Sequence, residues 1–444
     1  MKKKLLWVSD INLNTGFGQV ADNVLPELVK TNKYDIACMG INYRGDRHGY
    51  NGVHVYPCDS SDPYGFGVFP HVVMKERPDV IFVLQDLFVI MKYVDFLKQH
   101  APQIPTVFYF PIDGDSLPQP WLDSINYATV PVAYSNYGID IVSRYAPELR
   151  DKIRMVYHGI DTEVFKPLPD EERKIMKKNN HCDDKFVIGV VNRYQPRKLI
   201  PLTLRAFSLM KNGYKKCGDC GNYYLASLDK CDLNGCTNYT SQVVGKDDLF
   251  LYLHLNPMEK MMGWDNCTLH MSARAAGLDP QAKDIMTPGV DVYGPAAPDK
   301  HAMNQIYNMF DCYVASDCGE GFGLTQMEAL ACGLDVVKTS STTGQELIGE
   351  HGYLTKSAGF FSMAYDSGHY RPVAHVPSIV DTLEILYKKW VEAGRYISLS
   401  KEKHEYVKRE FNWKDKAKGL EQAISDAITF KAQPEGKVFK IYNV

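Results

Sequence analysis

Short apolar runs separated by longer amphipathic stretches recur along the first third of the chain. The stretch from Met91 to Gln99 is one of these amphipathic segments. Short buried strands that alternate with helices predict a parallel, doubly wound sheet. The strands expected on this pattern are Leu5–Val8, Ile36–Met39, Val53–Val55, Val80–Val83, Val107–Phe110, Val132–Tyr134 and Ile153–Tyr157.

The same pattern starts again after a polar segment, residues 168–184, which is rich in charges and contains Pro169. A chain of 444 residues is also longer than one hydrophobic core usually supports. We therefore predict an α/β protein with two Rossmann-like domains, whose ligands bind at the carboxyl ends of the strands. The strands expected in the second domain are Phe186–Val191, Leu249–Leu253, Cys312–Ser316 and Val336–Val337.

Composition narrows the class of protein. The net charge is −3, with 45% hydrophobic and 23% charged residues, so the chain lacks the overall positive field of a protein that binds nucleic acid by bulk electrostatics. The segment Met1–Asp10 has a basic start, but its apolar run is too short for a signal peptide and reads as a strand. No apolar run approaches membrane-spanning length. We expect a cytoplasmic protein.

The most distinctive stretch runs from Glu320 to Glu328 and reads Glu-Gly-Phe-Gly-Leu-Thr-Gln-Met-Glu. It follows the expected strand Cys312–Ser316 and leads into an apolar helical pattern. A strand, a glycine-rich turn and a helix in this order place backbone N–H groups and a positive helix end against a ligand phosphate. We expect Glu328 about two turns into the helix, on the face that points towards the turn. Such an arrangement suits a nucleotide-sugar, which carries a diphosphate between hydroxylated rings.

This stretch resembles the E-x7-E motif of retaining glycosyltransferases with the GT-B fold, the large family often called family 4 or glycosyl transferases group 1. Three further segments resemble parts of that family: Met155–Pro167 the entry to the second domain, Gly344–Glu346 the loop near the donor, and Phe411–Trp413 the terminal segment that crosses back to the first domain. The resemblance therefore covers most of the chain.

The resemblance implies the domain organisation and the fold. Residues 1–165 would form the acceptor-side domain, and residues 166–410 the domain that binds the nucleotide-sugar. Residues 411–444 would form a C-terminal helix and tail that return to the first domain. The two Rossmann-like domains of a GT-B enzyme face each other across a cleft.

The resemblance also implies roles for individual residues. Arg193 and Lys198 match the family's paired basic residues and would hold the donor diphosphate, where fixed cations stabilise the departing negative charge. Arg197 competes with Lys198 for this role, and the family spacing favours Lys198. Glu320 would bind the sugar hydroxyls and Glu328 the ribose. Backbone amides and glycines complete the expected donor site: Gly16, Gly18, Gly321, Phe322, Gly323, Leu324 and Thr325.

One position departs from the family pattern. Many retaining members carry a histidine near the transferred sugar, where this chain has Asp113 at the end of an expected strand. An aspartate there could stabilise positive charge on the sugar ring, and we expect Asp113 to be catalytic. Asp113 and Asp115 also spell a D-x-D pair, which binds a divalent metal in another glycosyltransferase fold. We favour the carboxylate role and expect no catalytic metal.

An insert at residues 213–246 carries a different chemistry. It contains a C-x2-C pair and a C-x4-C pair, at spacings that can close a tetrahedral zinc site. Four thiolates leave no open coordination position, so the expected zinc is structural. Lysines and tyrosines of the insert could contact nucleic acid, or could be the solvated face and small core of a mini-domain. The four expected ligands are Cys217, Cys220, Cys231 and Cys236.

The remaining cysteines show no ligand spacing. The chain has eleven cysteines and no export signal, so we expect free thiols in place of a disulfide framework. Most of these residues lie in or beside apolar runs and read as core thiols. They are Cys38, Cys58, Cys182, Cys267, Cys312, Cys318 and Cys332.

The sequence thus predicts a retaining glycosyltransferase that moves a sugar from a nucleotide-sugar, most often UDP- or GDP-linked in similar proteins, to an acceptor hydroxyl. The acceptor is not identified. The zinc insert and its lysines suggest a narrower hypothesis, glycosylation of a modified (hydroxymethylated) DNA base that is flipped out or single-stranded. A sugar-nucleotide epimerase, or a non-catalytic protein that binds sugar-nucleotide or nucleic acid, would have the same fold.

Overall fold

The computed structural model describes residues 2–13, 15–43, 45, 53–256, 269–288, 297–363, 366 and 368–431. Its contacts divide the chain into two units. Unit 1 comprises Met1–Gly159, Ala364–His369 and Phe411–Val444, and unit 2 comprises Ile160–Met363 and Tyr370–Glu410. Among the described helices, none is both long and apolar enough to cross a membrane.

Unit 1 is built on a seven-stranded parallel sheet with the strand order β3-β2-β1-β4-β5-β6-β7. Its first six strands follow the 3-2-1-4-5-6 order of the Rossmann fold. The strands are β1 (Lys3–Asp10), β2 (Tyr34–Ile41), β3 (His54–Pro57), β4 (Val80–Leu84), β5 (Thr106–Phe110), β6 (Val130–Ala133) and β7 (Arg154–Met155). The helices are α1 (Gly16–Thr31), α2 (Val68–Glu76), α3 (Leu87–His100), α4 (Gln119–Tyr127), α5 (Asn136–Tyr145), the 3-10 turn η1 (Pro147–Leu149) and α14 (Trp413–Lys431).

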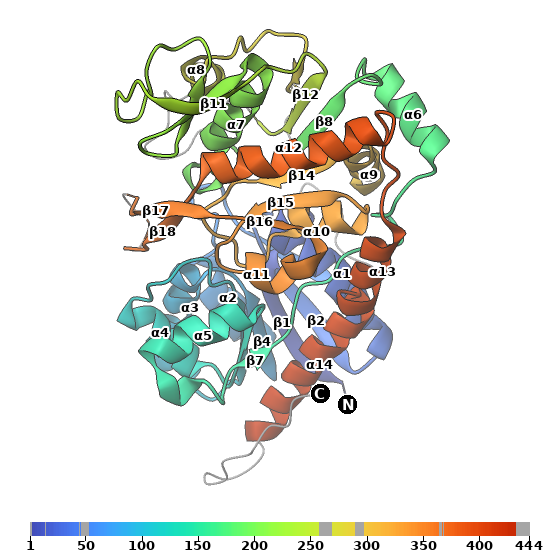
Figure 1. Ribbon diagram of the computed structural model, residues 1–444. Coiled ribbons are helices and arrows are strands. Elements are labelled where there is room, and N and C mark those ends of the chain that lie inside the picture. The colour runs from blue at the N-terminus through green and yellow to red at the C-terminus, as the bar shows by residue number, and fades with distance from the viewer. Residues whose placement is uncertain are drawn as a thin grey trace. The chain divides into compact units, whose positions relative to one another are not determined.

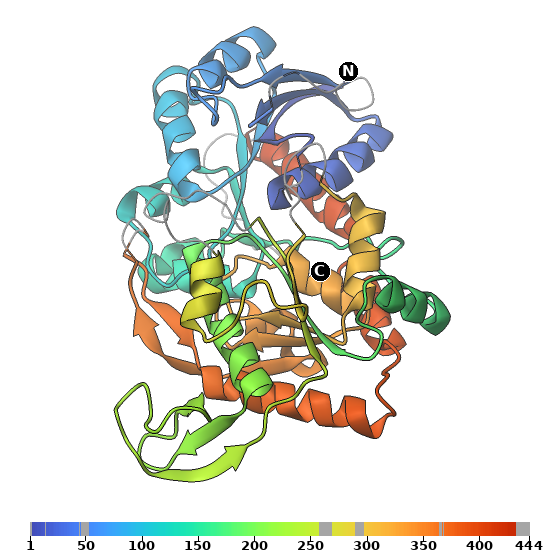
Figure 2. The same cartoon turned by 90° about the horizontal axis from the view of Figure 1, so that it is seen from above.

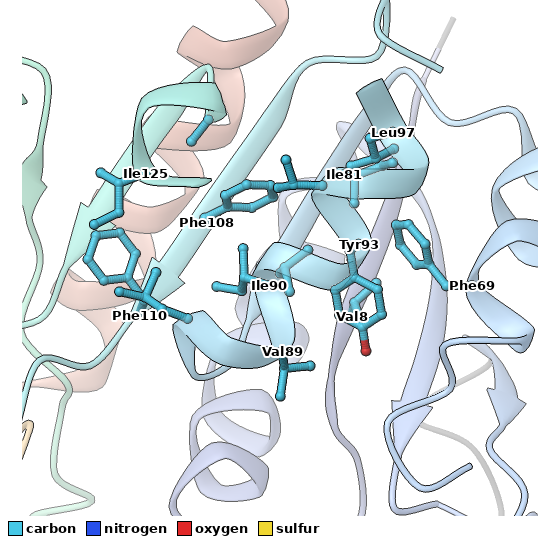
Figure 3. Close-up of a cluster of buried hydrophobic side chains, with 14 of the residues drawn as sticks. Val8, Phe69, Ile81, Val89, Ile90, Tyr93, Leu97, Phe108, Phe110 and Ile125 are labelled. Atoms are coloured by element: carbon cyan, nitrogen blue, oxygen red, sulfur yellow. The ribbon is translucent and has the colours of Figure 1, made fainter. Parts of the chain in front are cut away.

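The core of unit 1 lies between strands and helices. Ile81 and Phe108 on the strands face Ile90 of α3, while Phe69 of α2 and Tyr93 of α3 place their rings 4.4 Å apart (Figure 3). The C-terminal helix α14 contacts α1, β4, β5 and β6, so a segment remote in sequence completes this unit (Figure 1).

Unit 2 repeats the design with a six-stranded parallel sheet in the order β13-β12-β8-β14-β15-β16. This is again the Rossmann order, counted from β8, so the prediction of two doubly wound α/β sheets is confirmed. The strands are β8 (Phe186–Val191), β12 (Leu249–His254), β13 (Ile285–Met286), β14 (Cys312–Ala315), β15 (Asp335–Thr339) and β16 (Tyr353–Thr355). The helices are α6 (Asp170–Asn179), η2 (Pro196–Lys198), α7 (Ile200–Asn212), α8 (Leu269–Ala275), α9 (Lys300–Met309), α10 (Leu324–Ala331), α11 (Gly344–Leu347), η3 (Gly349–His351), α12 (Val376–Glu392) and α13 (Lys401–Glu410).

Two small antiparallel sheets extend unit 2. One contains β10 (Tyr223–Leu225), β9 (Tyr214–Cys217) and β11 (Tyr239–Val243), in this order, and forms the insert, a green lobe beside α7 in Figure 2. The rings of Tyr214 and Tyr223 stack 4.8 Å apart and belong to the main core of unit 2. The other sheet is the hairpin of β17 (Ser357–Phe361) and β18 (Arg371–Ala374).

Two segments contain helices that the sequence analysis did not predict. The polar stretch 168–184 contains the helix α6, whose inward face consists of Arg173 and Lys177, both almost fully buried. Because charged residues occupy the buried face, the apolar periodicity that marks other helices is missing here. The expected loop at Gly344–Glu346 is the short helix α11.

Candidate functional site

The candidate site of unit 2 lies where its strand order reverses. β8 and β14 are neighbours in the sheet, and their chain connections run in opposite directions, to β12 and to β15. In open α/β sheets such a switch point opens a crevice at the carboxyl ends of the strands. The loop after β8 carries Arg193, Arg197 and Lys198, and the loop after β14 carries Glu320. The topology therefore explains why residues more than a hundred positions apart meet.

The glycine-rich turn leads into the amino end of α10. Gly323 has φ of +86°, and a Cβ at this position would lie 2.4 Å from the side-chain nitrogen of Gln326. Glycine is thus required both for the left-handed turn and for space. α10 begins at Leu324, and no side chain caps it. The first backbone N–H groups of the helix, with its positive dipole end, are therefore available to an anion.

Glu320 meets two cations. Its carboxylate pairs with the Lys198 ammonium, and its Oε2 accepts a hydrogen bond of 3.2 Å from Arg197 Nη1. Burial opposes the charge of Glu320, but the two cations outweigh this effect and lower its pKa to about 2. Burial and then the neighbouring Arg197 lower the pKa of Lys198, while Glu320 acts in the opposite direction. Glu320 is therefore ionised at neutral pH and serves as the counter-ion of the basic loop.

The basic loop is itself held in place. Arg197 Nη1 also donates to the carbonyl oxygen of Gly319 at 3.0 Å, and the backbone N–H of Cys318 donates to the Arg197 carbonyl at 2.9 Å. Both Arg197 and Lys198 contact Glu320. The family spacing had favoured Lys198 over Arg197 as the cation that holds the donor diphosphate. The Arg193 side chain is exposed. When the Gln195 side-chain amide is oriented with its oxygen towards Arg193, that oxygen accepts hydrogen bonds of 3.0 Å from both Nε and Nη1 of Arg193.

A second set of polar residues supports Glu320 from behind. Lys338 at the end of β15 pairs with Asp317 at 2.6 Å, and both side chains are almost fully buried. The backbone N–H of Glu320 donates to Thr342 Oγ1 at 3.0 Å, and the Thr343 hydroxyl donates to the Glu320 carbonyl at 3.2 Å. The sequence analysis missed these four residues, and only Thr342 and Thr343 had an available signal, the polar run after β15. They hold the Glu320 loop rigid before a ligand arrives.

Glu328 lies on α10, just over one turn from its start, so the expectation of two turns was too long. Its side chain is buried, and its Oε2 accepts a hydrogen bond of 2.8 Å from the hydroxyl of Tyr307 on α9. Tyr307 is fully buried and was also missed by sequence reasoning. The neighbouring Thr325 Oγ1 lies 2.9 Å from the hydroxyl of Tyr313 on β14. These contacts fix the orientation of α10.

The other expected site residues belong to unit 1. α1 begins at Gly16, and its cap Thr15 accepts from the Gly18 N–H at 3.0 Å while donating to Asp10 at 2.6 Å. A Cβ at Gly18 would lie 2.1 Å from the carbonyl oxygen of Leu13, so this glycine is needed for packing of the turn. Asp113 follows β5 and is half-buried. These residues lie at the carboxyl ends of β1 and β5.

Three cysteines of the insert form one group, and the fourth lies beside one of them. The sulfur atoms of Cys217, Cys220 and Cys236 lie within 4.8 Å of one another, and those of Cys220 and Cys231 are 3.8 Å apart. A tetrahedral ion with Zn–S bonds of about 2.3 Å separates its ligands by about 3.8 Å, so the spacing fits zinc. Among the described residues, Asp113 and Asp115 belong to no comparable group of three possible metal ligands.

Each cysteine pair sits on a tight turn. The Cys217 N–H donates to the Asn222 carbonyl at 2.9 Å, and the Cys231 N–H donates to the Cys236 carbonyl at 2.7 Å. The backbone N–H of Cys220 is the main cause that lowers the pKa of the Cys217 thiol. Burial opposes it and the N–H of Asp219 adds to it, so that the pKa falls to about 7. N–H groups aimed at sulfur favour the thiolate that a metal requires.

The other cysteines in the described part of the chain lie in the core. Cys38, Cys58, Cys182, Cys312, Cys318 and Cys332 are buried, in agreement with the prediction of core thiols. Cys267 and the tail from residue 432 onwards lie outside the described residues.

Comparison with known proteins identifies the fold. Residues 265–364, which include Glu320 and Glu328, match the family model described as "Glycosyl transferases group 1". HepE from Anabaena, solved in complex with UDP and glucose, is similar with a TM-score of 0.62 at 14% identity, covering 96% of this chain and 100% of that chain. A comparison with curated protein sequences found no match.

Two further solved structures are similar over nearly the whole chain. Sucrose-phosphate synthase from Thermosynechococcus elongatus has a TM-score of 0.69 at 13% identity and covers 97% of this chain and 100% of that chain. The catalytic domain of starch synthase IV from Arabidopsis thaliana, bound to ADP and acarbose, has a TM-score of 0.59 at 12% identity, with the same coverage. The architecture of the chain is therefore that of the GT-B glycosyltransferases.

Proposed function

We propose that the protein is a retaining glycosyltransferase that transfers a sugar from a nucleotide-sugar to an acceptor hydroxyl. The observation that carries this proposal is the Arg197–Lys198–Glu320 cluster beside the uncapped amino end of α10. Cations and free N–H groups suit a diphosphate, and a neighbouring carboxylate suits sugar hydroxyls. The family match supports the proposal because it spans both Glu320 and Glu328.

The proposed reaction is a substitution on one face of the sugar. The bond from the anomeric carbon to the diphosphate breaks, and the acceptor oxygen bonds to the same face of that carbon. The acceptor proton passes to the departing diphosphate oxygen, so no protein nucleophile is needed. Arg193, Arg197 and Lys198 stabilise the negative charge that grows on the leaving group. The carboxylate of Glu320 already neutralises part of the positive charge of Arg197 and Lys198. The donor phosphates would therefore share these two cations with Glu320.

We propose a UDP-linked donor and no catalytic metal. The similar HepE structures contain UDP or UDP-glucose, and starch synthase IV contains ADP, which supports a nucleoside diphosphate as the leaving group in this fold. Glu328, held by Tyr307, is the proposed partner of the ribose hydroxyls. Asp113 is the proposed carboxylate near the sugar ring.

A donor screen tests this proposal. Purified protein is incubated with a panel of nucleotide-sugars, with and without candidate acceptors, and nucleotide release and product mass are measured. We expect acceptor-dependent release of nucleoside diphosphate, retention of the donor's anomeric configuration by NMR, and activity that survives EDTA. Inversion would refute the retaining mechanism. Release of free nucleotide together with an epimerised sugar, without acceptor, would identify an epimerase, and absence of turnover with every donor would indicate a binding protein.

The sugar acceptor is not identified, and the composition of the insert gives little support to the hypothesis that it is DNA. Residues 213–246 contain four lysines and three aspartates, with no arginine or glutamate, so the insert has little net charge. Several lysines in or beside the insert are engaged: Lys211 pairs with Asp284, Lys246 pairs with Glu384, and Lys215 donates to the Leu228 carbonyl. A nucleic-acid surface would carry net positive charge. Transfer to hydroxymethylated single-stranded DNA in the acceptor screen would restore the hypothesis of a DNA acceptor.

We further propose that the insert holds one structural zinc ion on Cys217, Cys220, Cys231 and Cys236. The sulfur spacing and the two tight turns support this site, and the metal would replace the core that such a small lobe lacks. Elemental analysis of protein prepared without chelators should find about one zinc per chain. The Cys217→Ser/Cys220→Ser variant should lose it, whereas Cys58→Ser, a buried thiol of unit 1, should keep it. Zinc-free wild-type protein would end this proposal.

A further inference from the structure

A histidine remote in sequence packs against the Asp113 loop. His369 lies between β17 and β18, yet its contacts place it, with the rest of Ala364–His369, in unit 1. Its side chain is only 3% exposed. Neither the motif analysis nor the proposed reaction uses this residue.

The contact is close and specific. His369 Nδ1 accepts a hydrogen bond of 3.1 Å from the backbone N–H of Ser116, so the ring proton resides on Nε2 when the imidazole is neutral. A Cβ placed on Gly114 would lie 2.3 Å from the same Nδ1 and 2.5 Å from Cγ of the ring. The imidazole therefore rests directly on the Gly114 backbone. The ring at position 369 therefore leaves no room for a side chain at position 114.

This contact fixes the backbone that carries Asp113 and Asp115, because Gly114 lies between them. Trp121 on α4 lies beside the ring, with centroids 6.2 Å apart, and the Tyr145 hydroxyl donates to the Asp115 carbonyl at 2.8 Å. The loop follows the carboxyl end of β5, the edge of the sheet where ligands bind in such folds. A ring buried against a loop at this edge restricts where the Asp113 carboxylate can lie.

We infer that His369 is a positioning residue for the loop Asp113–Ser116, and that it holds the Asp113 carboxylate in the geometry needed for sugar transfer. The second half of this inference rests on the proposed function, in which Asp113 faces the sugar ring. Stabilisation of a charge depends directly on distance, and displacement of a catalytic group by about 1 Å can cost about a hundredfold in rate.

Hydrogen exchange tests the positioning without any substrate. His369→Ala removes the acceptor of the Ser116 N–H, so amide exchange in a peptide covering residues 113–117 should accelerate at least about tenfold, as expected for loss of a net contribution of about 1.4 kcal/mol. His369→Asn keeps an acceptor near the position of Nδ1 and should retain most of the protection. His71→Ala, an exposed histidine of the same unit, should leave this peptide unchanged. Unchanged exchange in His369→Ala would overturn the inference.

A steric pair of variants tests the link to activity. Gly114→Ala introduces the clashing Cβ and should lower kcat for sugar transfer by about ten- to a hundredfold. His369→Ala should lower kcat by a similar factor, and His369→Asn should recover most of it. The Gly114→Ala/His369→Ala protein removes the clash, so its kcat should not fall below that of His369→Ala alone. UDP binding, assigned to unit 2, should stay within about twofold in all of them.

The outcomes separate the two proposals. Loss of protection with normal kcat in His369→Ala would overturn the catalytic half of the inference while leaving the proposed function intact. Absence of transfer in the wild type would overturn the proposed function, and with it the catalytic half, while the exchange experiment would still decide the packing role. Equal kcat losses in His369→Asn and His369→Ala, with restored protection in the former, would also contradict positioning by Nδ1.

Discussion

Unit 2 contains two clusters in which lysine and arginine meet a carboxylate that is fully or largely buried. In the first, Arg173 and Lys177 of α6 meet Asp311, which lies just before β14. In the second, Arg197 and Lys198 meet Glu320. The residue types are the same, and both carboxylates come from the segment around β14.

The clusters differ in where their hydrogen bonds go. Arg173 donates to the carbonyl oxygens of Asn308, Phe310 and Ile397 at 2.7–3.1 Å and to the Tyr396 hydroxyl, and its side chain is fully buried. Lys177 donates to Asp311 at 2.7 Å and to the Lys185 carbonyl at 3.1 Å. These partners are mostly backbone atoms of the fold, which no ligand can replace.

In the second cluster the two cations share one side chain, and Arg197 also donates to the Gly319 carbonyl. Arg197 and Lys198 converge on Glu320, and their side chains keep 30% and 6% exposure. A ligand phosphate can share cations that are bound to a carboxylate, but it cannot displace backbone carbonyls. The comparison leads to a rule for ion pairs at the carboxyl edge of a sheet. Such a pair suggests a binding site when a ligand can take the place of the anion that its cations bind.

The largest expected effect concerns the first cluster. Arg173→Met should lower the free energy of unfolding of unit 2 by about 3–5 kcal/mol, because it removes the donor of three carbonyl groups and one of the two cations beside the buried Asp311. Urea denaturation followed by tryptophan fluorescence, to which the buried Trp390 of unit 2 contributes, measures this change. The exposed neighbour Lys174, changed to Met, is the control and should alter stability by less than about 0.5 kcal/mol. A loss below about 1 kcal/mol in Arg173→Met would contradict the structural role.

Substitutions in the second cluster should lower the sugar-transfer activity. Lys198→Ala should keep the fold and lower kcat/KM for transfer by about ten- to a thousandfold, equivalent to about 2–4 kcal/mol, because a charge-assisted contact to the leaving group is lost. Glu328→Ala should act in the same direction through the ribose. The exposed Lys230→Ala serves as a control. Wild-type turnover in Lys198→Ala would remove the functional distinction between the clusters.

Acidification should weaken the second cluster. The cations lower the pKa of Glu320, against the opposing effect of burial, from 4.5 to about 2. A pKa that is lower in the folded state means that the stabilisation is complete above 4.5 and is lost as pH falls from 4.5 towards 2. The difference in unfolding free energy between wild type and Glu320→Gln should therefore be greatest near neutral pH, up to about 3 kcal/mol, and shrink across that window.

Urea titrations at several pH values provide this measurement, with the exposed Glu350→Gln as a control that should show little difference at any pH. A difference for Glu320→Gln that stays constant between pH 5 and pH 2.5 would show that the carboxylate is not held by its cations.

The smallest expected effect concerns Tyr307. Tyr307→Phe removes the hydroxyl that donates to Glu328 while keeping the ring in the core, so the carboxylate loses about 1.5–3 kcal/mol of orienting interaction. We expect KM for the donor to rise about tenfold with a smaller change in kcat, since the ribose contact exists in both ground and transition states. Steady-state kinetics with varied donor measures this split. A fall in kcat alone would contradict a ribose-binding role of Glu328.

The hydrophobic pattern of the sequence was sufficient for the two parallel sheets, because buried strands such as Phe186–Val191 consist almost entirely of apolar residues. It could not reveal α6, whose inward face carries Arg173 and Lys177, because charge on a buried face erases the periodicity on which the prediction depends. The cysteine spacing predicted a group of four thiols, and the structure gathers Cys217, Cys220 and Cys236, with Cys231 beside Cys220.

Local motifs singled out Glu320, Glu328, Arg193 and Lys198 as candidates, since a glycine turn or a basic run after a strand is visible within about ten residues of sequence. Lys338, Tyr307 and His369 left no such signal. Their importance comes from partners at Asp317, Glu328 and Gly114, and only the strand order and the close packing of the folded chain decide that such distant residues meet. The sequence thus determined the elements and the chemistry of the candidate site, and the tertiary structure decided what holds that chemistry in position.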